Sequence, residues 1–105
     1  MSRKPGDLIE KDPSATEPQG FDWTDYLLEL GAGVLIATST WAVDSGPDAI
    51  LTLANDSIVV GSLKTQVYLV AGTLGGRYTV RNRIVTNSTP PVTDDRSFDV
   101  FMVQR

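Results

Sequence analysis

The sequence predicts an all-β fold, an immunoglobulin-like antiparallel β-sandwich of about seven strands. Three observations lead to this prediction. Short runs of β-branched and aromatic residues alternate with turn residues about every 8 to 12 positions. One of these runs, residues 76–86, places apolar and charged side chains on opposite faces of an extended strand. No stretch of the chain has a sustained helical period of apolar residues.

The strand expected at residues 76–86, GRYTVRNRIVT, determines which side chains face the core. Side chains alternate across a strand, so the even-numbered residues from Tyr78 to Ile84 share one face. Arg81 and Arg83 lie on the other face. We therefore expect the mostly apolar even face to be buried and the arginine face to be in water.

Further strands are expected at residues 34–43, 49–53, 57–60, 64–70 and 95–104. Residues 22–28 are interpreted as an irregular first strand; a single helical turn with Asp22 or Thr24 as N-cap is the alternative. Trp41 and Tyr78 are expected in the core, and Tyr78 has the position of a tyrosine corner.

Residues 1–20 differ in composition from the sandwich domain expected at 21–105. They contain three prolines, two glycines and seven charged residues, with Leu8 and Ile9 as an isolated apolar pair. Such a segment cannot bury enough surface to offset the entropy lost on ordering. We expect an extended N-terminal arm that orders on a neighbouring subunit, with Leu8 and Ile9 as anchors; a tail without a role is the alternative.

Composition limits the classes of function. The chain has 105 residues, enough for one domain, with neither cysteine nor histidine. It therefore lacks disulfides, thiolate metal sites, and the most common general base and nitrogen ligand. The net charge of −4 argues against nucleic-acid binding. No apolar run is long enough to span a membrane, and no secretory signal is recognisable, so we expect no membrane contact.

Acidic residues in the expected loops are the only candidates for metal or acid–base chemistry. Asp94 and Asp95 precede the last strand, and Asp44 and Asp48 bracket a turn, but their spacing does not resemble a calcium loop. The glycine-rich run at 72–76 precedes a strand and does not open a helix, so it is not a phosphate-binding loop. We therefore predict no enzyme activity, no catalytic residue, no metal and no cofactor.

The last strand places apolar side chains beside the arginines. If Phe98, Val100 and Met102 face inward, Phe101 and Val103 face outward, next to Arg81 and Arg83. A surface that mixes Phe, Val and Arg has the composition enriched at protein interfaces. We predict a docking face here, and we expect the edge of the strand at 95–104 to be uncovered and to invite strand addition. The predicted partner-binding residues are Leu8, Ile9, Trp23, Arg81, Arg83, Phe101 and Val103, of which Trp23 belongs either to the core or to the interface.

Five sequence blocks follow one another along the chain: KDP at 11–13, FDWTDYL at 21–27, IATSTWAV at 36–43, YTVRNRIVT at 78–86 and DDRSF at 94–98. Together and in this order they resemble the small tailed-phage virion proteins of the fiber-tail adaptor family. The resemblance covers residues 11 to 105. Arg81, where a threonine is more usual before Asn82, and the Pro90-Pro91 pair depart from the pattern on the surface.

The resemblance implies a non-catalytic structural component of a phage virion, made in the bacterial host cytoplasm, that joins tail or fiber proteins by docking. Its expected partners are other phage structural proteins of the tail, fiber or capsid, and copies of itself remain possible partners. A capsid cement or decoration protein is the first alternative function. A carbohydrate- or calcium-binding β-module is the second.

Overall fold

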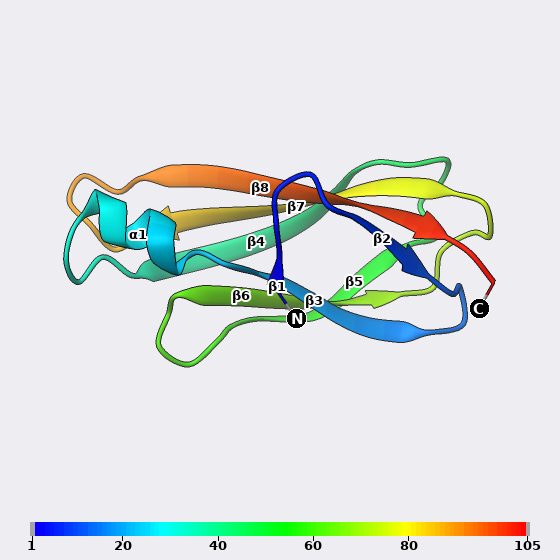
Figure 1. The fold of residues 1–105 in the computed structure, drawn as a ribbon, viewed down its shortest axis with the longest axis horizontal. Coiled ribbons are helices and arrows are strands. Elements are labelled where there is room, and N and C mark those ends of the chain that lie inside the picture. The colour runs from blue at the N-terminus through cyan, green and yellow to red at the C-terminus, as the bar shows by residue number, and fades with distance from the viewer. Residues whose placement is uncertain (1, 105) are drawn as a thin grey trace.

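Two four-stranded sheets pack face to face in the computed structural model, which describes residues 2–104 (Figure 1). Along its principal axes the molecule measures 44 × 22 × 20 Å. The elements of the described residues are β1 (Ser2–Arg3), β2 (Leu8–Lys11), β3 (Thr16–Asp22), α1 (Thr24–Leu30), β4 (Ile36–Ser45), β5 (Thr52–Ile58), β6 (Lys64–Val70), β7 (Arg77–Thr86) and β8 (Thr93–Met102). One sheet has the strand order β1-β3-β6-β5 and the other β2-β8-β7-β4. The predicted all-β sandwich is confirmed.

The immunoglobulin-like part of the fold prediction stays a prediction. That fold consists of two antiparallel sheets, whereas here β1 pairs with β3 in parallel and β2 pairs with β8 in parallel. The remaining pairs, β3–β6, β5–β6, β4–β7 and β7–β8, are antiparallel.

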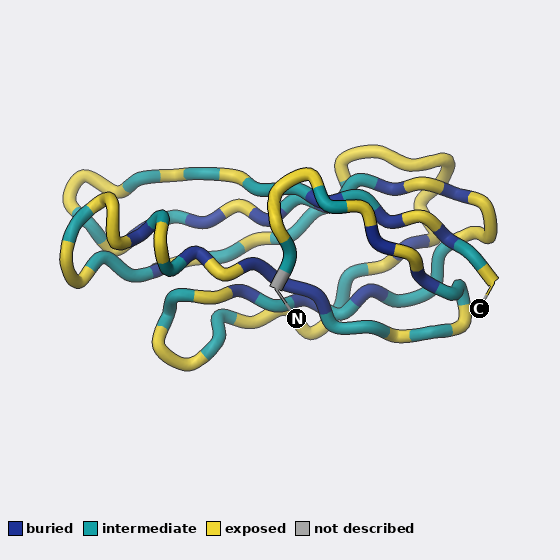
Figure 2. The backbone as a smooth tube through the Cα atoms, viewed as in Figure 1, coloured by how far each residue is buried: buried dark blue, intermediate teal, exposed yellow. Residues whose placement is uncertain are grey.

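The core lies between the sheets and is built by alternation along each strand, which Figure 2 shows as alternating buried and more exposed segments. On β7, Tyr78, Val80 and Ile84 are fully buried, and on β8, Phe98, Val100 and Met102 are as well. On both strands the inward-facing residues are the ones that the sequence predicted. Trp41 stacks on Phe21 with ring centroids 5.9 Å apart; it was expected in the core, but it is only partly buried and packs against the core.

Asn82 is a polar side chain on the inner face of β7, and it is fully buried. Its Oδ1 accepts hydrogen bonds from the Trp23 indole N–H at 3.0 Å and the Thr65 hydroxyl at 2.7 Å. Its Nδ2 donates to Ser39 Oγ at 2.9 Å and to the Thr40 carbonyl at 3.1 Å. All four hydrogen-bonding positions of the amide are used. The core therefore contains a polar network in which each donor and acceptor of the Asn82 side chain has a partner.

Tyr78 makes the contacts of a tyrosine corner. Its hydroxyl accepts a hydrogen bond from the Thr73 backbone N–H at 3.0 Å, five residues upstream, and donates to Asp48 Oδ1 at 2.6 Å. The phenol thus joins the β6–β7 turn to the loop after β4.

Residues 24–30 form a helix, so the irregular first strand predicted for 22–28 is wrong. The Asp22 carboxylate accepts a hydrogen bond from the Thr24 N–H at 2.9 Å, and this turn starts α1. Hydrogen bonds from the Thr24 hydroxyl and from the Thr24 backbone N–H hold the pKa of Asp22 below its usual value. The predicted alternative is right that this segment is helical, but the N-cap is Trp23 and not Asp22 or Thr24, and no side chain caps the helix.

β5 corrects the strands predicted at 49–53 and 57–60. The structure forms one strand, Thr52–Ile58, with a shift in register between Ala54 and Ser57. Asn55 has a positive φ of 51° at that point. The Asn-Asp pair therefore makes a β-bulge and not a turn, since Asn tolerates the left-handed region better than most residues.

Residues 1–20 were expected to form an arm outside the sandwich, but the structure places most of the described part of this segment in the two sheets. β2 pairs with β8 from Leu8 to Lys11, and β3 pairs with β6 from Thr16 onward. The uncovered edge predicted for the last strand is therefore wrong, because β2 covers it. Ile9 points into the core with 6% of its surface exposed. The segment buries Ile9 against its own chain and leaves Leu8 exposed, and backbone pairing provides the rest of its order. Residue 1 lies outside the described residues.

Candidate docking surface

The outer face of the β2-β8-β7-β4 sheet carries most of the residues predicted to bind a partner. Because Tyr78, Val80 and Ile84 point inward, the alternating residues of β7 point outward, and these include Arg81 and Arg83. On β8, Phe101 is outward and 36% exposed, and Val103, just after the strand, is half-buried. On β2, Leu8 is outward and 53% exposed. We call this surface the outer face.

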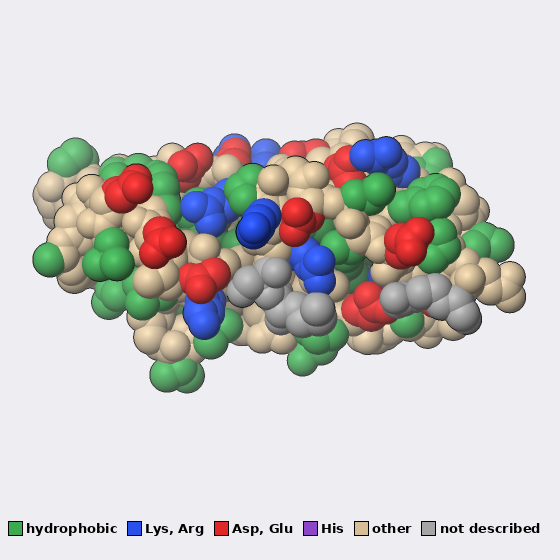
Figure 3. Space-filling model, in the orientation of Figure 1, with side chains coloured by type: hydrophobic (Ala, Val, Ile, Leu, Met, Phe, Trp, Pro, Cys, Tyr) green, Lys and Arg blue, Asp and Glu red, His purple; other side chains and the backbone are tan. Residues whose placement is uncertain are grey.

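Each outward arginine of β7 pairs with an aspartate of a neighbouring strand. Arg83 donates two hydrogen bonds to Asp95, from Nε at 2.7 Å and from Nη2 at 2.9 Å. Arg77 Nη2 lies 2.8 Å from Asp99 Oδ2, and Arg81 Nη2 lies 3.4 Å from Asp44 Oδ1. The outer face is therefore a set of balanced ion pairs, and Figure 3 shows positive and negative side chains interspersed along the molecule.

These pairs alter the titration of their members. The hydrogen bond from Arg83 lowers the pKa of Asp95, and hydrogen bonds from Arg77 and Thr79 lower that of Asp99. The pKa of Arg83 is raised by the same contact with Asp95. All of these groups stay charged near neutral pH. Since ion pairs exposed to water contribute little stability, a partner can replace them at small cost.

Two predicted partner-binding residues lie in the core. Ile9 alternates inward on β2, and Trp23 is fully buried between Phe21 and Asn82. Arg96 covers the indole of Trp23, with its guanidinium carbon 4.1 Å from the ring centroid. The prediction left Trp23 open between core and interface, and the structure assigns it to the core.

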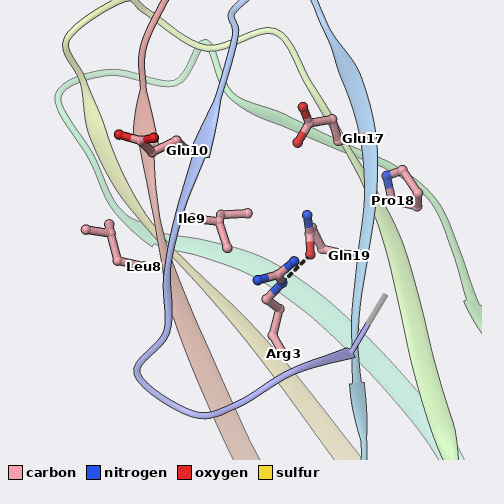
Figure 4. Close-up of a pocket in the computed structure, with 7 residues that line it drawn as sticks. All are labelled: Arg3, Leu8, Ile9, Glu10, Glu17, Pro18 and Gln19. Carbon is pink, nitrogen blue, oxygen red and sulfur yellow. Dashed lines mark hydrogen bonds between the residues drawn. The ribbon is translucent and has the colours of Figure 1, made fainter. Parts of the chain in front are cut away.

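A cleft of about 630 Å³ opens where β2, an edge strand of one sheet, lies apart from the part of β3 in the other sheet that β1 does not cover (Figure 4). Ile9 and Gln19 point into it from opposite walls, Glu10 and Glu17 lie toward one end, and Arg3 lies toward the other. Arg3 Nε donates to Gln19 Oε1 at 2.6 Å. Sequence reasoning missed this cleft because it placed residues 1–20 outside the domain; Pro18, a residue that favours sheet edges, was the available signal.

The loop acids considered for calcium have other contacts. Asp48 accepts hydrogen bonds from Thr73 Oγ1 and the Tyr78 hydroxyl, which lower its pKa, and Asp44 pairs with Arg81. Among residues 2–104, no three acidic side chains gather in a way that could hold a metal ion. Within the same residues, no helix has the length and apolar character needed to cross a membrane.

The β-sandwich with its ion-paired outer face and open strand edges is typical of a structural module that binds other proteins. A family model described as podophage GP4 fiber-tail adaptor protein gp77 matches residues 11–101. The chain therefore belongs to this phage fiber-tail adaptor family, which implies a structural component of the virion. No curated protein matches the sequence.

Proposed function

We propose that this protein is a non-catalytic adaptor that joins tail and fiber proteins of a podophage by docking its outer face onto them, after synthesis in the host cytoplasm. The family match over residues 11–101 carries the proposal, because the family is one of fiber-tail adaptors. The outer face supplies the contacts: Leu8 and Phe101 provide exposed apolar area, and Arg81 and Arg83 provide charge.

The form of the outer face suits docking by exchange of ion pairs. A bidentate arginine–carboxylate pair has a fixed geometry that a partner carboxylate can reproduce. Docking then desolvates Phe101 and Leu8, which contributes the apolar part of the binding free energy. No step of this proposal requires bond making or breaking, which is consistent with a structural family.

Reversing charge at both Arg81 and Arg83 to Glu tests the proposal. We expect a large loss of the protein from purified particles, measured by quantitative mass spectrometry, with a melting temperature close to that of the wild type. Lys64→Glu is the matched control, since Lys64 lies on the other sheet and has an exposed aspartate 4.0 Å away. Normal incorporation of the double variant would contradict the proposal.

A further inference from the structure

One wall of the cleft between β2 and β3 has backbone hydrogen-bonding groups that are not bonded to any of residues 2–104. In the parallel pair of β2 with β8, the Asp99 N–H donates to the Asp7 carbonyl at 2.7 Å, and the Val103 N–H donates to the Lys11 carbonyl at 2.9 Å. Backbone N–H and C=O groups point to alternate sides along a strand, so the N–H and C=O groups of Ile9, like those of Asp7 and Lys11, point toward β8. The N–H and C=O groups of Leu8 and Glu10 therefore face the cleft.

The opposite wall cannot bind a strand equally well. The Trp23 N–H donates to the Leu63 carbonyl at 2.9 Å, so the odd-numbered residues of β3 face β6 and the even-numbered ones face the open side. Pro18 is one of the latter, and it has no N–H to donate. β1 covers only Gly20 and Phe21 of β3. A strand that enters the cleft can therefore form a regular ladder of backbone hydrogen bonds with β2 but not with β3.

The charge of the β2 edge indicates which charge the side chains of an added strand should carry. The carboxylate of Glu10, whose side chain lies on the wall formed by β2, forms no hydrogen bond or ion pair with residues 2–104. At the far end of the cleft, the guanidinium of Arg3 already binds Gln19. A basic side chain opposite Glu10 makes a favourable cross-strand pair. Because the chain carries a net charge of −4, this arrangement favours a basic segment of another protein over a second copy.

We propose that the β2 edge binds an extended, basic segment of a partner virion protein, which adds as a strand beside Leu8 and Glu10 and places alternate side chains over Ile9 and Gln19. This inference rests on the proposed adaptor function and specifies how one of its contacts is made. The backbone bonds give affinity, and Glu10 selects for a lysine or arginine.

Leu8→Pro and Leu8→Ala form a matched pair of variants. Both remove the outward side chain, but only proline removes an N–H that the β2–β8 ladder does not use. We expect about tenfold less Leu8→Pro than Leu8→Ala protein in purified particles. We also expect Glu10→Lys to be incorporated less than Glu10→Gln. Equal incorporation within both pairs would overturn the inference.

Hydrogen–deuterium exchange of the wild-type protein provides a test that does not depend on the folding of a variant. The amides of Leu8 and Glu10 should exchange fast in the free protein and slowly in the particle. Fast exchange in both states would overturn the inference, and so would a purified dimer in which the same amides are protected, since a second copy would then be the occupant. Loss of incorporation for the Arg81/Arg83 variant alone would leave the adaptor function intact and reject only the added strand. Absence of the wild-type protein from particles would reject the adaptor function itself.

Discussion

The polar side chains on the two faces of β7 differ in burial and in the kind of partner that they contact. On the inner face, Asn82 is fully buried and its amide exchanges hydrogen bonds with Trp23, Thr65 and the β4 strand. On the outer face, Arg81 and Arg83 pair with aspartates that water also reaches. The inner contacts have no substitute when broken, whereas water or a partner can replace the outer ones. We infer that stability depends on the inner face and that recognition is left to the outer one.

Replacing Asn82 with Ala should have the largest effect on stability. The substitution leaves the Trp23 indole N–H and the Thr65 hydroxyl buried without their acceptor. We expect the free energy of unfolding to fall by about 3 to 5 kcal/mol, measured by urea denaturation. Thr65→Val, which removes one donor and keeps the Trp23 bond, should cost only about 1 kcal/mol. Equal losses for the two variants would mean that Asn82 does not organise the network.

Tyr78→Phe tests the connection between the buried face and the loops. It removes a hydroxyl that accepts from Thr73 and donates to Asp48, while the ring stays in the core. We expect a loss of about 1 to 2 kcal/mol, measured in the same way.

The same substitution should also change how stability depends on pH. Hydrogen bonds from Thr73 and Tyr78 lower the pKa of Asp48 in the folded protein. A carboxyl with a lowered pKa contributes stability above its unfolded pKa of about 3.9 and loses it as the pH falls through the folded value. Acidification below about pH 4 should therefore destabilise the wild type more than Tyr78→Phe. Parallel curves of unfolding free energy against pH would contradict this reasoning.

A double-mutant cycle with Arg83→Gln and Asp95→Asn should show the smallest effect on stability. Both side chains are substantially exposed, so their coupling should be weaker than the loss from Tyr78→Phe, and it should decrease further in high salt. Unfolding at low and high salt measures it. A coupling as large as the effect of Asn82→Ala would mean that the outer pairs also hold the fold together.

Strands in which apolar and polar side chains clearly alternate were predictable from the sequence. The run from Arg77 to Thr86 was assigned with its correct inward residues because an apolar face opposite arginines permits only one phase. The outward positions of Arg81, Arg83 and Phe101 follow from the same pattern, and their role as contacts stays a prediction.

Elements held by long-range backbone pairing or by a local side-chain turn were not predictable in this way. β2 and β3 have too few apolar residues to reveal a buried face, and long-range pairing with β8 and β6 makes them strands. The helix α1 depends on a hydrogen bond from the Thr24 N–H to Asp22, which competes with a weak strand pattern. The cleft depends on both β2 and β3, so it could not be found before they were placed.

Lys11 gives the N-terminal segment a chemical marker. Its side chain is fully buried, and its ammonium donates to the backbone carbonyls of Asp12 and Ala71 at 2.9 and 2.7 Å. Lys4 and Lys64 are exposed. An amine-acylating reagent should therefore modify those two lysines quickly and reach Lys11 only when β2 detaches, so the order of labelling reports whether the first strands stay docked while the adaptor assembles.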